Sequence, residues 1–470
     1  MRTLMIVSLM TCLALLMVPV ENLAETDAGA KDTPDISILQ EITFLDLETA
    51  QRIALSNSPN LFAAAERVNQ ASARVQQARA AYWPTLDAEG SASRVDLSNN
   101  TEEAQQEQLR LFNPNASVDN PEDFYRASMV ASWTVFDGFR RHFSNALAEY
   151  GEDASEAAYF EAQRLLLSAV ADSYYIAQLA RKNIAIADAD EAFNQRQLEE
   201  AKTRYRVGTG SLSDMLNFEV AVNAARSAKN SFNREYRIAL VGLAALLGVP
   251  DAYLPAGLDL ASLEEATQKE MAPPDPADHL DYAMRHRPDV LQNESILNQT
   301  EAGVGIARSR FYPLMQLAGS VDGERANSAR FEGDDFGNTV GVFLTYRLYS
   351  GGERRAQLAE AKYQQREAEE NLLAVKIEVA ADVQEAVENI KAAQFELELQ
   401  RRNAVLVLEN RDLVEKEYQA GQASLVRLNE AQRDLNQAQS RLALARVGLR
   451  QALKDLSAST GRILMPFASP

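Results

Sequence analysis

The residues best placed for chemistry in this sequence lie at two short turns, each marked by a glycine. In the first half of the chain the turn glycine is Gly208, followed by the polar residues Ser213 and Asp214. In the second half it is Gly421, followed by Arg427 and Glu430. A serine or an acid at such a position can cap a helix, because it satisfies N–H groups that lack a partner in the first turn. An arginine and a glutamate three residues apart can form a solvated ion pair, or they can present alternating charge to an ion or a partner beyond the helix. The sequence leaves both the structural and the functional interpretation open at each turn.

The composition argues against an enzyme. We find no nucleophile and base at a catalytic spacing, no glycine-rich phosphate loop and no metal-ligand spacing, so no catalytic, cofactor-binding or metal residue is predicted. The only cysteine is Cys12, and the three histidines, His142, His279 and His286, form no cluster. The formal net charge of −20 also argues against nucleic acid as a partner, because phosphate groups would be repelled.

The chain begins with a segment typical of a secretory signal. Arg2 is followed by an apolar run from Leu4 to Val20 that is too short to span a bilayer. Small residues suitable for cleavage lie at Ala24 and again near residue 30, so we assign residues 1–24 to the signal, with cleavage as late as residue 30 still open. No later stretch reaches the ~18 apolar residues of a membrane-spanning helix, so any passage through a membrane would use strands.

Landmark residues recur at constant offsets and indicate an internal repeat. An offset of 213 (351 − 138) carries Gly351 to Gly138, Gly421 to Gly208 and Gly461 to Gly248. A second offset of 229 (288 − 59) relates Pro288 to Pro59. We therefore predict a first repeat at residues 45–248 and a second at residues 282–464, joined by a proline-containing linker at residues 249–281.

Each repeat is predicted to contain long helices and two strands. No Gly or Pro lies between Glu353 and Ala420 to interrupt a helix, whereas alternation of apolar and polar residues marks strands of about ten residues, long enough to cross a bilayer when tilted. The elements expected in the first repeat are helices over 45–82 and 140–247 and strands over 84–94 and 125–136, with a polar loop over 95–124. Those expected in the second repeat are helices over 289–311 and 353–460 and strands over 313–322 and 339–349.

The last helix carries a heptad pattern of large and small apolar residues. The leucines of this pattern are Leu428, Leu435, Leu442, Leu449 and Leu456, and the alanines are Ala431, Ala438, Ala445 and Ala452. A repeat of seven residues lets helices lie close together and supercoil. The pattern is weaker in the first repeat, where Lys229 interrupts it. Both repeats are thus predicted to be long antiparallel helical hairpins.

Aromatic residues gather where the expected helices meet the expected strands. They are Tyr82, Trp83, Trp133, Phe136, Phe311, Tyr312, Tyr346 and Tyr349, and they include both tryptophans of the chain. Membrane-spanning barrels place an aromatic girdle at this height. The alternative is an aromatic cluster beneath a water-exposed hairpin. Nearby acids at Asp87, Glu89, Asp322 and Glu324 cannot face lipid cheaply, so we expect them to line the interior of a barrel or its outer mouth.

Several motifs resemble those of the TolC-type outer-membrane efflux protein family over about Leu45 to Leu464. The joints from strand to helix are Phe136-Asp137-Gly138 and Tyr349-Ser350-Gly351, and the hairpin tips are Tyr205-Arg206-Val207-Gly208 and Tyr418-Gln419-Ala420-Gly421. Their occurrence in duplicate at one offset makes the resemblance specific. It implies a mainly α fold with β structure, in which long antiparallel helical hairpins form a periplasmic α-barrel and four strands per chain join a trimeric 12-stranded β-barrel. The linker at residues 249–281 would then be equatorial.

The resemblance also implies roles for the hairpin tips. In the family these tips face a periplasmic adaptor (membrane fusion) protein and an inner-membrane pump of the RND or ABC class, and they close the tunnel when it is idle. The corresponding residues here are Tyr205, Gly208, Ser213, Asp214, Tyr418, Gly421, Arg427 and Glu430. Tyr418 resembles a tyrosine that ties the closed tip, but the family's basic partner is replaced by Ala423. Arg427 stands where an acid is expected, so we hypothesise an alternating Arg427/Glu430 constriction.

We therefore predict an outer-membrane protein with a long periplasmic extension, a homotrimer in contact with outer-membrane lipid. Its function would be that of the passive exit duct of a tripartite efflux or type I secretion system, with the energy supplied by the pump. Drugs and other small molecules or unfolded proteins are the cargoes in view, and the sequence does not choose between them. The rival interpretation is a soluble periplasmic coiled-coil scaffold protein. An enzyme has no residue constellation to support it.

Overall fold

The computed structural model describes residue 39, residues 42–255 and residues 257–467. The predicted export signal, residues 1–24, lies outside these ranges. The chain divides into two compact units that each take segments from both sequence repeats. The first unit contains the residues up to Pro59, Ala169–Glu265 and Gln400–Val447, and the second contains Asn60–Ser168, Ala266–Leu399 and the residues from Gly448 onward.

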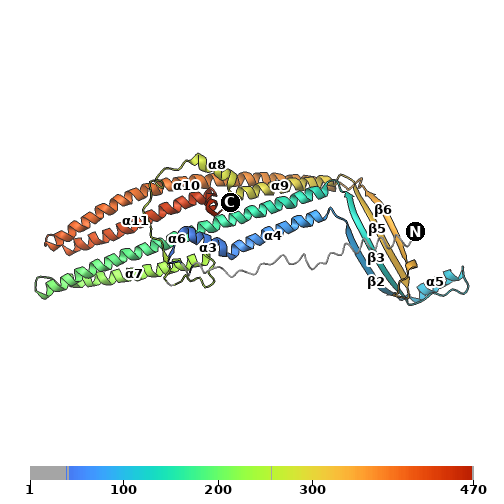
Figure 1. Ribbon diagram of the computed structural model, residues 1–470, viewed down its shortest axis with the longest axis horizontal. Helices are drawn as coiled ribbons and strands as arrows, with labels where there is room; N and C mark the ends of the chain where they lie inside the picture. Colours follow the sequence, from blue (N-terminus) through green and yellow to red (C-terminus); the bar gives the residue numbers. More distant parts are fainter. Residues whose placement is uncertain (1–38, 40–41, 256, 468–470) are drawn as a thin grey trace. The chain divides into compact units, whose positions relative to one another are not determined.

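Long helices make up most of the structure, as the scarcity of Gly and Pro predicts (Figure 1). Those of the first repeat are α3 (Leu47–Asn57), α4 (Pro59–Ala80), α6 (Arg140–Arg206) and α7 (Leu212–Leu246). Those of the second are α8 (Pro276–His286), α9 (Pro288–Ser309), α10 (Glu353–Gln419) and α11 (Leu425–Ser459). None of the helices in the described ranges has both the length and the apolar composition that crossing a membrane requires.

The heptad residues of α11 are the buried side of that helix. The buried members are Leu428, Leu435, Leu449, Leu456, Ala431, Ala438, Ala445 and Ala452. Leu442 is half-buried. The predicted seam is therefore confirmed, and alternation of leucine with alanine lets neighbouring helices approach closely. In the first repeat, Lys229 is held by ion pairs to Asp188 at 2.5 Å and Glu191 at 3.4 Å instead of entering an apolar seam.

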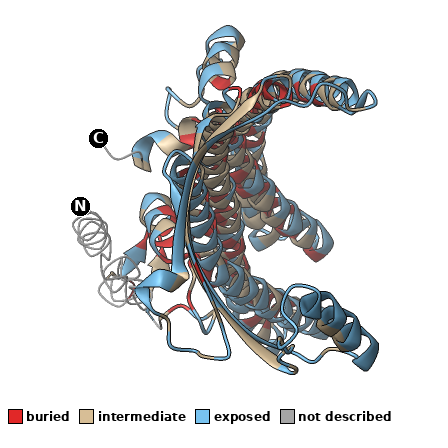
Figure 2. Ribbon diagram, turned by 90° about the vertical axis from the view of Figure 1, so that its right-hand side faces the viewer, coloured by how far each residue is buried: buried red, intermediate tan, exposed pale blue. Residues whose placement is uncertain are grey.

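A four-stranded antiparallel sheet lies in the second unit. Its order is β2 (Thr85–Val95), β3 (Glu122–Phe136), β5 (Leu314–Ala326) and β6 (Phe336–Thr345), so each repeat gives two adjacent strands. Seen along the chain's longest axis, the sheet is an arc (Figure 2). Strands β2 and β6 form its two edges. Among the described residues, each of these strands has one side whose backbone groups pair with no other strand.

The predicted strand limits were partly wrong. We expected strands over 125–136, 313–322 and 339–349, whereas β3 begins at Glu122, β5 continues to Ala326 and β6 covers Phe336–Thr345. At one end of the sheet charged residues continue the pairing, with Arg94 opposite Asp123 and Arg325 opposite Tyr125. At the other end Tyr346 and Tyr349 follow strand β6 and do not belong to it. The alternation of apolar and polar residues indicates which side chains are buried, not which backbone groups are paired. It therefore does not detect strand ends made of polar residues.

The region 95–124, expected to be a loop, contains helix α5 (Asn99–Arg110). Its sequence is rich in Glu and Gln, which are good helix formers. Only Ala104 and Leu109 are apolar, so the helix has no apolar stripe and periodicity gave no signal for it.

The predicted linker, residues 249–281, is more ordered than the sequence suggested. In the first unit β4 (Asp259–Leu260) pairs in parallel with β1 (Phe44–Leu45). The Tyr174 hydroxyl donates to the backbone carbonyl of Leu45 at 3.0 Å, and the Gln178 amide donates to that of Ala261 at 2.7 Å. Burial raises the pKa of Tyr174, so the phenol stays protonated and acts as a donor. At its other end the linker overlaps α8, which begins at Pro276.

Candidate functional site

Two glycine turns shape the hairpin tips in the first unit. Gly208 and Gly421 have φ of +78° and +76°, a conformation that favours glycine and ends the preceding helix. The helix that follows is capped by serine in both repeats: the Ser211 hydroxyl accepts from the N–H of Ser213 at 3.0 Å, and the Ser424 hydroxyl accepts from the N–H of Arg427 at 3.3 Å. The cap expected at Ser213 or Asp214 is thus made by Ser211, and Asp214 lies in the first turn of α7.

Tyr418 connects the two tips. Its ring lies edge-on to the buried ring of Phe218 in α7, with centroids 6.3 Å apart, and the guanidinium carbon of Arg204 in α6 lies 5.5 Å from the tyrosine centroid. Burial and the nearby Asp214 raise the pKa of Tyr418, so the phenol is neutral across the physiological range. The sequence singled out Tyr418 but missed Arg204 and Phe218, because neither lies at the position that the family pattern would use.

The remaining tip residues are more exposed. Arg427 forms a salt bridge with Glu417 at 3.2 Å, and the described residues show none between Arg427 and Glu430. Glu430 and Tyr205 are exposed. The i,i+3 ion pair weighed from the sequence is therefore wrong, and the pair instead joins the end of α10 to the start of α11 across the Gly421 turn.

Farther along these helices, polar side chains cross the packed interior of the first unit. The buried Gln197 amide donates to Glu415 at 3.0 Å, and the buried Gln432 amide donates to Asp190 at 2.9 Å. Arg411 also binds Glu415 at 3.0 Å. These contacts connect α6 to α10 and α11. A pattern of hydrophobic residues could not predict them, because the side chains involved are polar.

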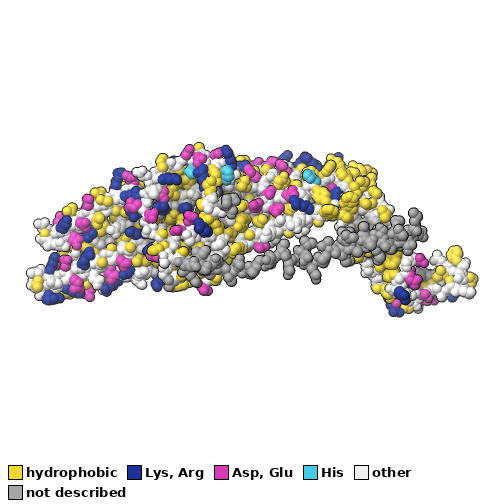
Figure 3. Space-filling view, viewed as in Figure 1, with side chains coloured by type: hydrophobic (Ala, Val, Ile, Leu, Met, Phe, Trp, Pro, Cys, Tyr) yellow, Lys and Arg dark blue, Asp and Glu magenta, His cyan; other side chains and the backbone are white. Residues whose placement is uncertain are grey.

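The aromatic residues predicted for a girdle lie in the second unit, where helices end and strands begin. Six are exposed, namely Tyr82, Trp83, Trp133, Tyr312, Tyr346 and Tyr349, whereas Phe136 and Phe311 are half-buried. Hydrophobic side chains gather at this junction (Figure 3). The Trp133 indole N–H donates to the carbonyl of Tyr82 at 3.0 Å, which fixes one ring in place. An exposed indole with a satisfied N–H suits the boundary between water and lipid.

One face of the sheet is polar. Strand pairing sets Glu89 opposite Ser128 and Ser128 opposite Asp322, and on the next row Arg126 binds Glu324 at 2.7 Å. Because side chains alternate along a strand, these residues and Asp87 share one face. The opposite face carries the apolar residues Leu86, Met129, Ala131, Leu317 and Val321.

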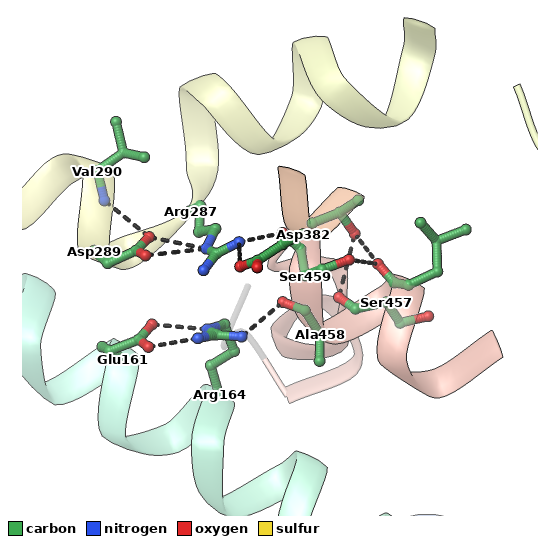
Figure 4. Close-up of polar contacts among 11 residues, drawn as sticks. Glu161, Arg164, Arg287, Asp289, Val290, Asp382, Ser457, Ala458 and Ser459 are labelled. Atoms are coloured by element: carbon green, nitrogen blue, oxygen red, sulfur yellow. Dashed lines mark hydrogen bonds and ion pairs between the residues drawn. The ribbon is translucent and has the colours of Figure 1, made fainter. Parts of the chain in front are cut away.

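Two buried arginines hold the end of α11 within the second unit (Figure 4). Arg164 binds both carboxylate oxygens of Glu161, at 2.5 and 2.7 Å, and donates to the carbonyl of Ala458 at 3.1 Å. Arg287 meets two further acids and donates to the carbonyl of Ser459 at 3.1 Å. The last carbonyls of a helix have no partner in the helix itself, so these arginines act as its C-terminal cap. Sequence reasoning missed them.

Among the described residues, no group of three or more His, Cys, Asp or Glu could hold a metal ion. The chain does offer a sheet with one polar and one apolar face, and helical tips tied by an aromatic contact.

Comparison with known proteins gives a consistent picture. The family model described as outer membrane efflux protein matches residues 51–249 and 280–462. The pyoverdine export outer membrane protein OpmQ of Pseudomonas aeruginosa is 28% identical over 442 residues, which cover 91% of this chain and 89% of that protein. The probable efflux pump outer membrane protein TtgC of Pseudomonas putida is 26% identical over 412 residues, which cover 84% of this chain and 78% of that protein. Among solved structures, the outer membrane protein VceC of Vibrio cholerae superimposes with a TM-score of 0.73 at 18% identity, covering 88% of this chain and 96% of that one.

Proposed function

Because the chain belongs to the outer membrane efflux protein family, we propose that it is the trimeric, passive exit duct of a tripartite efflux or type I secretion system. Membership of this family places the protein in the outer membrane and argues against the rival interpretation, a soluble periplasmic scaffold.

The observation that carries the proposal is the sheet. Its four strands leave β2 and β6 unpaired on one side, and unpaired strand edges are not tolerated in lipid. Four strands are too few to close on themselves, so several copies would have to join edge to edge in a ring. The apolar face would then meet lipid and the acidic face would line the passage. Three copies, and so twelve strands, follow from the family resemblance.

The duct is proposed to be passive, with no catalytic role. Energy would come from an inner-membrane pump of the RND or ABC class, coupled through a periplasmic adaptor protein. OpmQ is named for pyoverdine export and TtgC for an efflux pump, which supports small molecules as cargo here.

We further propose that Tyr418 latches the closed tip. Its contacts with Phe218 and Arg204 join helices from the two repeats, so separating the tips would have to break them. Such an aromatic pair and a cation–π contact are each worth about 1 kcal/mol, small enough for a partner protein to overcome. The proposed contacts for the adaptor or pump are the exposed tip residues Tyr205, Gly208, Ser213, Gly421, Arg427 and Glu430, together with the half-buried Asp214.

Conductance of the purified protein in planar lipid bilayers tests this function. We expect discrete channels from the wild type and a higher mean conductance from Tyr418→Ala. A matched control is Tyr363→Ala, since Tyr363 lies on the same helix, is 65% exposed and stacks with Arg366 of its own helix. Absence of channels from protein that fractionates with outer membranes would refute the duct. Equal conductance of Tyr418→Ala and the wild type would refute the latch alone.

A further inference from the structure

We propose that the α5 loop (residues 96–121) is a clasp that binds the β5–β6 loop (residues 327–335) of a neighbouring copy of this chain. The inference rests on the proposed ring of copies and adds to it a specific contact between them. It assigns a role to helix α5, which is not one of the elements of the sheet.

The α5 loop is held in one shape by amide side chains. The Asn120 amide donates to Glu102 at 2.6 Å and to the carbonyl of Leu97 at 3.1 Å, and its oxygen accepts from the N–H of Leu97 at 2.7 Å. The Gln106 oxygen accepts from the N–H of Val118 at 2.7 Å, and its amide donates to the carbonyl of Ala116. Glu102 and Gln106 are four residues apart, so one face of α5 is used to bind its own loop.

The other face of α5 is charged and points to solvent. Glu103 and Glu107 are exposed and four residues apart, an arrangement of like charges that is unfavourable in an isolated helix. Just beyond the helix, Leu111 and Phe112 are 79% and 88% exposed. A rigid loop that displays two acids beside an apolar corner is suited to a partner with a cation and an apolar side chain.

The β5–β6 loop supplies such a partner surface. Arg330 is exposed, and within the described ranges its side chain takes part in no salt bridge, while its neighbour Phe331 is half-buried against Phe336 with centroids 5.5 Å apart. Arg325 fixes the loop by binding Glu332 at 3.3 Å and Asp335 at 3.0 Å. Both loops are therefore preorganised for contact.

Topology brings these two loops together between copies. The end of β2 at Val95 and the start of β6 at Phe336 lie at the same end of the sheet, because the four strands alternate in direction. In Figure 1 helix α5 lies beyond that end. Within one chain, β3 and β5 separate β2 from β6, although the two loops touch where the Asn327 amide donates to Asp119 at 3.4 Å. That contact involves neither helix α5 nor Arg330. If copies join edge to edge, β6 of one copy lies beside β2 of the next, and the two loops become neighbours.

The occupant of the α5 surface is therefore a second copy, with Arg330 between Glu103 and Glu107. A membrane surface is a poorer match, since anionic lipid head groups would be repelled by the acids. The contact would extend the strand pairing at each junction of the ring by a charged and apolar patch.

Disulfide trapping tests the clasp. The sequence has one cysteine, Cys12, which falls in the predicted signal, so cysteines introduced into the mature chain stand alone. We expect the Glu107→Cys, Arg330→Cys double variant to give covalent dimers and trimers on a non-reducing denaturing gel after mild oxidation of outer membranes. The matched control is Gln105→Cys with Arg330→Cys, because Gln105 is exposed on the side of α5 opposite Glu103 and Glu107. Cross-linking by the control as strong as that of the test pair would overturn the proposal.

A charge exchange supplies the second measurement. Arg330→Glu should lower the temperature at which the detergent-solubilised oligomer dissociates, and adding Glu103→Arg and Glu107→Arg should restore it. If lysine cross-linking shows the oligomer but the cysteine pair does not react, the clasp is refuted and the duct stands. If no oligomer forms in membranes at all, the proposed duct fails and the clasp fails with it.

Discussion

Replacement of Arg287 by methionine should lower the stability of the second unit by more than replacement of an exposed arginine. The arginine side chain is 5% exposed, and its guanidinium lies 3.0 Å from Asp289 and 2.7 Å from Asp382. It also donates to the carbonyl of Ser459. Methionine fills a similar volume, so the change removes charge and hydrogen bonds without leaving a large cavity.

The size of the loss depends on what remains behind. Leaving one member of a buried ion pair without its partner costs about 3–5 kcal/mol when that charge is fully buried. Here the Asp289 and Asp382 side chains are 23% and 40% exposed, so water can solvate them in part. Loss of the donor to the Ser459 carbonyl adds about 1 kcal/mol. We therefore expect a total of about 2–4 kcal/mol for Arg287→Met.

Thermal unfolding of the detergent-solubilised protein, followed by circular dichroism at 222 nm, measures the effect as a fall of several degrees in Tm. The matched control is Arg285→Met, two residues earlier in the last turn of α8, where the pair with Asp281 spans 2.6 Å but both side chains are more than 60% exposed. Such a surface pair contributes at most about 1 kcal/mol. Adding Asp382→Asn to Arg287→Met should recover part of the loss. Equal Tm values for Arg287→Met and Arg285→Met would refute the reasoning.

Three further predictions concern a turn, a histidine and a tip. Gly248→Ala should lower Tm, since Gly248 has φ of +74° and a Cβ there would lie 2.4 Å from a backbone carbonyl oxygen of α3; Gly448→Ala, in open space within α11, should raise stability by about 0.5–1 kcal/mol. Burial and, to a smaller extent, a nearby arginine lower the pKa of His279 from its ordinary value of 6.5. The folded protein therefore favours the neutral ring, and this contribution to stability is complete above pH 6.5 and is lost as the pH falls below it. His279→Gln should flatten this part of the Tm–pH curve. Arg427→Ala leaves Glu417 unpaired at the tip, so single-channel recordings should show a stronger cation preference than the wild type, and an unchanged preference would exclude Arg427 from the passage.

The sequence predicts the repeated framework well, for a physical reason. Helices and strands bury one face, and a buried face must repeat at 3.6 or 2 residues, so Leu428 and its heptad partners are visible in the sequence alone. Glycine turns are equally visible, because Gly208 and Gly421 take a conformation that other residues avoid.

Contacts between polar side chains are what the sequence conceals. Helix α5 has no apolar stripe and is held by Asn120 and Gln106 through hydrogen bonds that follow no period. Arg164 and Arg287 are buried because acids and helix-end carbonyls far along the chain surround them. Their types alone would suggest surface residues. Only the folded chain brings such partners together.

The two hairpin tips have diverged by exchange of charge, which explains why only one tyrosine is packed. The offset of 213 equates Arg204 with Glu417 and Asp214 with Arg427, so the basic and acidic positions are reversed between the repeats. Because the charges are reversed, Arg204 of the first repeat stacks on Tyr418 of the second. Glu417 forms a salt bridge with Arg427 within the second repeat.

The same offset equates Phe218 with Ala431. Tyr418 therefore meets a large ring from the other repeat, whereas Tyr205 is 47% exposed. Arg204→Glu should accordingly repel Glu200, the acid that Arg204 pairs with at 3.8 Å, and loosen the Tyr418 contact, whereas Arg204→Lys, which keeps the charge over the ring, should loosen it less. Tyrosine fluorescence quenching by acrylamide in a Tyr205→Phe background would follow the exposure of Tyr418 against the other tyrosines. Equal quenching in both variants would show that charge at position 204 does not hold the ring in place.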